Sequence, residues 1–225
     1  SALALLCFGL FVSGAFSVAA PEEVPLSAFM EGVRHPFVRT ISGQAKGTVQ
    51  HRGGDAPRRM RVELGFAFSP DGSEARATLE DGASCRMVWQ HGQKGSARIV
   101  EQSPDAAVSL IDFGIHPQDL TFSFLFWKPV EEKRRDTVSG QPCRVIRLQH
   151  PDSGATVLGW FSEKFLFPLR LEWTPAGEDG PTRVCEFTRF KQQEDGTWFI
   201  RSLRIYGQGW KTKLTLDDIT LDIGE

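Results

Sequence analysis

This sequence of 225 residues contains very little tyrosine, and its net charge is close to zero. A single tyrosine stands against 17 phenylalanines and 6 tryptophans, and the formal net charge is -2. Large aromatic side chains without a hydroxyl favour dry surroundings. Basic and acidic residues are interspersed, so no basic patch marks a phosphate backbone as a partner. We therefore exclude nucleic acid as a partner and look for a function in the apolar side chains.

Motifs of the common enzymes are also missing. The sequence contains no GxSxG, no HExxH and no phosphate-binding glycine loop, and Asp112-Phe113-Gly114 lacks the partner motifs of a kinase. Asp217, Asp218 and Asp222 fall on both faces of one predicted strand, which disfavours a metal site. The histidines lie far apart in turn-like contexts, as surface residues do: His35, His51, His91, His116 and His150. We predict no catalytic site, no metal and no cofactor.

Cysteine is rare, and no CxxC spacing occurs, which argues against a zinc ribbon or a thioredoxin-type motif. Cys7 lies in the N-terminal apolar segment. The remaining Cys85, Cys143 and Cys185 form an odd set, so one disulfide and one thiol are possible in an oxidising compartment. The sequence leaves the choice of pair open.

Residues 1–20 carry no charge and end in small residues. This pattern is typical of the apolar core and cleavage region of a secretory signal, and we expect the sequence to begin inside that signal. Cleavage after Ala19 or after Ala20 fits the pattern. The alternative is an uncleaved membrane anchor, because the segment is nearly long enough to span a bilayer. We predict a signal peptide over 1–20 and a single domain over 21–225.

The stretch Val157–Trp173 shows the dominant pattern, which is period-2 alternation. Leu169, Leu171 and Trp173 alternate with charged residues, so one face of that strand is predicted to be apolar. The preceding strand is apolar on both faces, with Leu158, Trp160 and Phe161. Such a strand needs cover on both sides, from protein or from a ligand.

A short amphipathic helix precedes the first strand, because Leu26, Phe29, Met30 and Val33 recur at helical spacing. From Val38 onward the period becomes two. One face of that strand then carries small residues, which would let something bulky lie across it or would mark a bend or a close-packed helix. This face consists of Ile41, Gly43, Ala45, Gly47 and Val49.

Further strands are predicted at hairpin spacing along the whole chain. The segments are Val62–Phe68, Glu74–Leu79, Cys85–Gln90, Ser96–Glu101, Lys133–Val138, Cys143–Gln149, Ala155–Phe161, Leu169–Trp173, Arg183–Phe190, Trp198–Tyr206 and Lys211–Ile223. In the last one the apolar parity slips at Asp217-Asp218, which predicts a β-bulge. About ten or eleven antiparallel strands with few helices indicate a mainly β protein with one large curved sheet or barrel.

The middle of the chain has fewer turn signals. Asp105–Leu110 and Pro117–Phe126 are each predicted as a short helix, with Leu120 and Phe124 paired at i+4. The alternative for the second segment is a strand, which would leave a flat apolar edge.

The aromatic set suggests a binding function. A curved sheet whose large apolar residues face inward either packs a solid core or leaves an apolar cavity. An acyl chain would gain about 0.8 kcal/mol per buried CH₂ in such a cavity, and movable short helices over its mouth would permit release. The candidate ligand-binding residues are Phe66, Phe68, Trp89, Leu120, Phe124, Trp160, Leu169, Leu171 and Trp173.

The C-terminal half also carries a resemblance to a known family. The residues concerned are Glu131-Glu132, Val138 to Leu148 (VSGQPCRVIRL), Gly159-Trp160-Phe161 with Pro168-Leu169-Arg170, Gly196-Thr197-Trp198 and Lys211 to Leu216 (KTKLTL). Over roughly 115–225 this pattern resembles the LolA-like superfamily of periplasmic outer-membrane lipoprotein-sorting proteins. It is more similar to an uncharacterised branch of that superfamily than to the carrier itself.

The resemblance implies an unclosed antiparallel β-barrel in which short helices form a lid over a hydrophobic cavity. It further implies a periplasmic carrier that binds lipid or lipoprotein acyl chains and exchanges them with membrane-associated donor and acceptor proteins. We expect this carrier to be a monomer without catalytic activity. The alternative is an envelope-stress sensor or scaffold domain that uses the same half-barrel to bind a protein partner.

Overall fold

The computed structural model describes residues 24–54, 56–92, 97–104, 108–192 and 198–224. The predicted signal at 1–20 lies outside the described residues. Helical elements, with η for 3₁₀ turns, are α1 (Leu26–Arg34), η1 (His35–Val38), η2 (Ile111–Phe113), α2 (Pro117–Thr121) and η3 (Ser123–Phe126). The strands are β1 (Ile41–Arg52), β2 (Arg58–Ser69), β3 (Gly72–Leu79), β4 (Ser84–Gln90), β5 (Arg98–Gln102), β6 (Lys128–Val138), β7 (Gln141–Gln149), β8 (Thr156–Ser162), β9 (Pro168–Thr174), β10 (Arg183–Gln192), β11 (Trp198–Gly207) and β12 (Trp210–Ile223).

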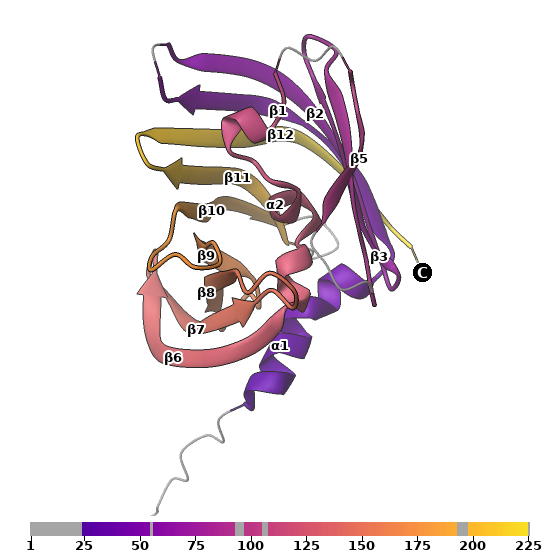
Figure 1. The fold of residues 1–225 in the computed structure, drawn as a ribbon. Helices are drawn as coiled ribbons and strands as arrows, with labels where there is room; N and C mark the ends of the chain where they lie inside the picture. Colours follow the sequence, from indigo (N-terminus) through magenta and orange to yellow (C-terminus); the bar gives the residue numbers. More distant parts are fainter. Residues whose placement is uncertain (1–23, 55, 93–96, 105–107, 193–197, 225) are drawn as a thin grey trace, which may run out of the picture.

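The strands of the described chain form one antiparallel sheet that curves around a hollow without closing (Figure 1). Its order is β5-β4-β3-β2-β1-β12-β11-β10-β9-β8-β7-β6, so β5 and β6 are free edges. The predicted unclosed, mainly β barrel is confirmed, with twelve strands instead of ten or eleven. Within the described residues, no helix is long and apolar enough to cross a membrane.

The helix predicted around Leu26 to Val33 is α1, and it buries Phe29, Met30 and Val33. It lies at one end of the curved sheet (Figure 1). Arg34 in its last turn donates hydrogen bonds to the carbonyls of Leu125, at 2.7 Å, and Trp127, at 3.2 Å. These bonds join α1 to η3, although the two elements are about ninety residues apart in the chain.

The small residues of β1 have two separate explanations. A Cβ at Gly43 would lie 2.5 Å from the ring of Phe66, so the bulky group across this strand is a side chain of β2. A Cβ at Gly47 would lie 2.0 Å from the Thr215 carbonyl oxygen. Gly47 stands at the register shift between β1 and β12, where Asp217 is the extra residue. The β-bulge predicted at Asp217-Asp218 is confirmed.

In its described residues, the segment between β5 and β6 is helical in three short pieces. Helix over Pro117–Phe126 is confirmed but interrupted, because Phe122 has a left-handed φ of 53° and separates α2 from η3. Leu120 and Phe124 therefore belong to different elements and do not form an i, i+4 pair on one helix. Of the predicted helix at 105–110, residues 105–107 lie outside the described residues; 108–110 are not helical, and η2 starts at Ile111.

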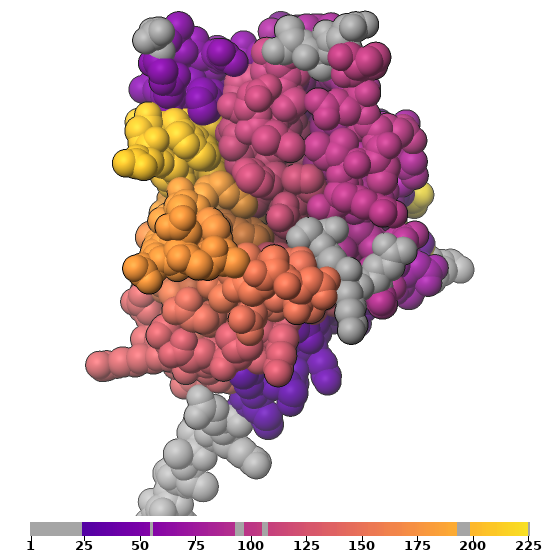
Figure 2. All heavy atoms as spheres, in the orientation of Figure 1, coloured from indigo at the N-terminus to yellow at the C-terminus, as the bar shows by residue number. Residues whose placement is uncertain are grey.

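This segment packs inside the hollow of the sheet, where hydrogen bonds anchor it to several strands (Figure 1). Ser73 of β3 donates to the Thr121 carbonyl at 2.8 Å, and Thr212 of β12 donates to the Phe113 carbonyl. In the space-filling view it lies between the orange and yellow strands on one side and the magenta strands on the other (Figure 2). The short helices thus fill part of the hollow between the two halves of the sheet.

The three described cysteines are free and buried. The disulfide that the sequence left possible is therefore not formed among Cys85, Cys143 and Cys185. They lie on β4, β7 and β10, no two of which are adjacent in the sheet. Burial raises the pKa of all three thiols.

Candidate functional site

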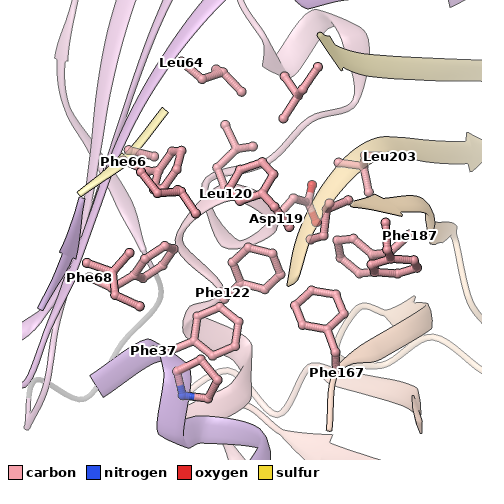
Figure 3. Close-up of a pocket in the computed structure, with 18 of the residues that line it drawn as sticks. Phe37, Leu64, Phe66, Phe68, Asp119, Leu120, Phe122, Phe167, Phe187 and Leu203 are labelled. Carbon is pink, nitrogen blue, oxygen red and sulfur yellow. The ribbon is translucent and has the colours of Figure 1, made fainter. Parts of the chain in front are cut away.

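An apolar cavity of about 370 Å³ remains inside the barrel beside the helical segment (Figure 3). Its wall is formed by η1, α2, the β8–β9 turn and strands from both halves of the curved sheet. The lining residues are His35, Pro36, Phe37, Arg39, Ile41, Leu64, Gly65, Phe66, Phe68, Ala75, Asp119, Leu120, Phe122, Phe165, Leu166, Phe167, Phe187, Phe190, Phe199, Ile200, Leu203, Leu214, Leu216 and Leu221.

Nine of these side chains are phenylalanines, and Phe122 is at their centre. Its ring centroid lies 4.8 Å from that of Phe37 and 5.7 Å from those of Phe167 and Phe187. The left-handed backbone at Phe122 ends α2, and the ring lies in the middle of the labelled cluster (Figure 3). The fold thereby joins aromatic residues from η1, α2 and β10 in one wall.

The mouth of the cavity is marked by the exposed lining residues His35, Pro36 and Arg39. The β8–β9 turn lies beside them, because a Cβ on Gly32 of α1 would be 3.1 Å from Leu166. In that turn the Ser162 hydroxyl accepts hydrogen bonds from the backbone of Lys164 and Phe165. Basic and aromatic groups therefore surround the opening.

A carboxylate interrupts the apolar wall. Asp119 of α2 is buried, and its Oδ2 accepts hydrogen bonds from the guanidinium of Arg183, at 2.5 Å, and from the backbone N–H of His116, at 2.8 Å. Arg183 is also buried; it donates to the Gly114 carbonyl and lies over the Trp173 ring, 4.8 Å from its centroid. Burial and the nearby Arg183 charge both lower the pKa of His116.

Three of the nine predicted ligand-binding residues, Phe66, Phe68 and Leu120, line this cavity. The other six do not. Trp89 faces inward but stacks on Phe126 of η3, with ring centroids 4.5 Å apart. The remaining inward-facing members are buried in the sheet and around the helical segment: Phe124, Leu169, Leu171 and Trp173.

Trp160 does not face inward, and that part of the prediction is wrong. In β8 the inward residues are Val157, Gly159 and Phe161, which places Trp160 on the outer surface by the period of two. There its Nε1 donates to Asp136 at 2.9 Å, and Arg170 lies over its ring. On the outer face, Trp160 is thus in contact with charged side chains from β6 and β9.

Sequence reasoning missed most of the cavity phenylalanines. Phe187 lies on the same face of β10 as the buried Cys185, and this period-2 signal was present in the sequence. Phe165 and Phe167 lie in a turn, where alternation gives no direction. Phe37 and Phe122 come from 3₁₀ and helix-end positions whose direction depends on tertiary packing.

Solved structures of similar shape identify the fold of this chain. A DUF1329 family protein from Desulfovibrio piger superposes with a TM-score of 0.69 at 12% identity, over 90% of this chain and 95% of that one. An outer-membrane lipoprotein-sorting protein domain from Vibrio parahaemolyticus gives 0.63 at 14% identity, over 82% and 86%. A LolA-superfamily protein from Nitrosomonas europaea gives 0.60 at 12% identity, over 90% and 96%.

The chain therefore has the LolA-like fold, as its C-terminal motifs predicted. No protein-family model matches the sequence, and no curated protein matches it. At identities this low the likeness establishes the fold, and the function has to be argued from the cavity.

Proposed function

We propose that this protein is a periplasmic carrier that binds the acyl chain of a lipid or lipoprotein in the phenylalanine-lined cavity and serves outer-membrane lipoprotein sorting. The observation that supports this most directly is the cavity itself, whose wall is apolar except at Asp119 and at the exposed mouth. The LolA-like fold supports a carrier over an enzyme, and we propose no catalytic step.

The volume of the cavity favours a ligand of small cross-section. Small-molecule sites usually measure about 300–1,000 Å³, and this one, at about 370 Å³, suits one acyl chain or a similar apolar molecule. About ten buried methylenes would contribute roughly 8 kcal/mol. This gain is similar in size to the free-energy cost of association, about 4–15 kcal/mol. Binding of a short chain would therefore be weak and readily reversed. Reversible binding is what transfer between donor and acceptor proteins requires.

The mouth supports a chain whose polar head stays in water. His35 and Arg39 are exposed there, and the aromatic turn residues Phe165 and Phe167 are half-buried beside the opening. A neutral or anionic head would meet these basic groups. The chain behind it would contact only the interior side chains.

The test is to fill the cavity and to measure ligand uptake. Ala75 of β3 is buried and lines the cavity, whereas Ala67 of β2 is exposed on the outer face. We expect Ala75→Phe to abolish uptake of a fluorescent fatty acid and to remove lipid from the purified protein in native mass spectrometry. Ala67→Phe makes the same change in side-chain volume on the opposite face, and it should keep wild-type binding.

Unchanged binding by Ala75→Phe would exclude the cavity as the site. A wild-type protein that takes up no lipid at all, and instead co-purifies with a protein partner, would favour the sensor or scaffold alternative. In that case the half-barrel would serve as a protein-binding surface.

A further inference from the structure

Asp119 has one carboxylate oxygen unused in an otherwise apolar wall. The residue is 1% exposed and belongs to the lining of the cavity, where it lies among Leu120, Leu203 and Phe187 (Figure 3). Oδ2 is occupied by Arg183 and by the His116 N–H. Within the described part of the chain, Oδ1 is buried and has no hydrogen-bond partner. A buried acceptor left in this state costs free energy, which a bound donor would recover.

The other unpaired buried atoms do not share this position. In the described residues they are His91 Nε2, Ser123 Oγ, Trp127 Nε1, Trp173 Nε1 and Ser202 Oγ. None of these residues lines the cavity. Asp119 is thus the cavity-lining residue with an unpaired buried polar atom among the described residues. Its carboxylate is a strong hydrogen-bond acceptor, because hydrogen bonds to a charged group are stronger than those between neutral groups.

The charge of Asp119 is already balanced. Arg183 is 7% exposed and pairs with it directly, so the two buried groups together are neutral. A cationic ligand group would add an uncompensated charge to a dry site, which is unfavourable. A neutral donor would add none. The site therefore selects a hydroxyl or an amide N–H.

The carboxylate is also held in a fixed place. The His116 N–H and Arg183 orient it, and Arg183 is itself positioned by the Gly114 carbonyl and the Trp173 ring. Ser73 and Thr212 anchor the segment that carries it to β3 and β12. Such preorganisation lowers the cost of forming one more hydrogen bond.

From these observations we infer that Asp119 is a specificity-determining residue, and that the ligand carries a neutral hydrogen-bond donor on its apolar body, bound to Oδ1. This inference rests on the proposed function, because it requires the cavity to bind an apolar chain. It narrows the ligand class from acyl chains in general to those with a hydroxyl or amide inside the cavity.

Three matched probes test the inference: hexadecane, 1-hexadecanol and the methyl ether of that alcohol, each displacing a fluorescent fatty acid. The alcohol and the ether both offer an oxygen acceptor, but only the alcohol donates a hydrogen bond. We expect the alcohol to bind the wild-type protein at least about ten times more tightly than the ether. Equal affinities for alcohol and ether, with all three probes binding, would overturn the inference and leave the proposed function standing.

The variant Asp119→Asn supplies a second measurement. Its amide can place an NH₂ group toward the cavity, which donates to alcohol and ether alike, so the ratio of their affinities should fall to about one. Asp222→Asn, an exposed position on β12, is the matched control and should keep the wild-type ratio. If none of the probes binds wild-type protein, the proposed function fails together with the inference.

Discussion

At the scale of single residues, His150 links stability to pH. The side chain is buried at the end of β7, and its Nδ1 accepts hydrogen bonds from the backbone N–H groups of Asp152 and Ser153, both at 3.1 Å. Trp127 packs against the ring, with centroids 4.8 Å apart. Burial lowers the pKa of His150, and the nearby Asp152 opposes this only in part. The folded state therefore holds the ring neutral.

We predict that the free energy of unfolding falls as the pH is lowered from 7.5 to 5.5. The unfolded chain takes up a proton at His150 near pH 6.5, whereas the folded chain resists it, so the unfolded state binds more protons in this window. Burial also lowers the pKa of His51, His91 and His116, which adds to the effect. Urea denaturation at the two pH values measures it.

The variant His150→Asn isolates the contribution of His150 to the pH dependence of the free energy of unfolding. An amide oxygen can accept the same two hydrogen bonds without titrating. Its stability should decrease less between the two pH values than that of the wild type. An identical decrease in both proteins would contradict the assignment to His150.

At the scale of elements, α1 is fastened to the helical segment by one side chain. Arg34 donates to the carbonyls of Leu125 and Trp127, and its guanidinium lies over the Phe126 ring at 5.9 Å. Burial lowers the pKa of Arg34. These bonds satisfy two carbonyls at the end of η3.

We predict that Arg34→Met destabilises the protein by about 1–3 kcal/mol, since it removes the donors and leaves carbonyls unpaired. Chemical denaturation followed by circular dichroism measures the change. Arg204→Met, at an exposed position on β11, should stay within about 0.5 kcal/mol of the wild type. Equal stability of the two variants would show that the α1 contacts contribute little.

At the scale of the whole molecule, the unclosed sheet has two edges, and both are protected from pairing with other chains. β5 has five residues, with a register shift against β4. β6 is long, but its run from Glu131 to Asp136 is charged and exposed, it contains Pro129, and its register shifts twice against β7. Charges, proline, bulges and short length are the usual means of blocking an edge.

We predict that replacing Lys133, Arg134 and Arg135 together with valine produces concentration-dependent association through β6. Size-exclusion chromatography with light scattering would detect it as a rise in mass with protein concentration. A control with Arg134→Lys and Arg135→Lys keeps the charge and should remain at the wild-type mass. No association by the valine variant would contradict a protective role for these charges.

Local patterns in the sequence determined α1, the strands and the bulge of this protein. The helical spacing of Leu26 to Val33 specifies α1, and period-2 alternation with turn residues specifies the strands. The parity slip at Asp217 specifies the bulge in β12. These features depend on residues within a few positions of one another, and a curved, mainly β sheet follows from their number.

Only the tertiary structure decided which side chains meet the cavity. Trp160 and Phe161 are neighbours in an apolar strand, and the direction of the sheet turns one outward and the other inward. Phe122 reaches the cavity because its backbone breaks the helix there. Asp119 and Arg183 are 64 residues apart, and no local pattern links them. The physical reason is that strand period fixes alternation, whereas the choice of face and of partner depends on contacts between segments far apart in the chain.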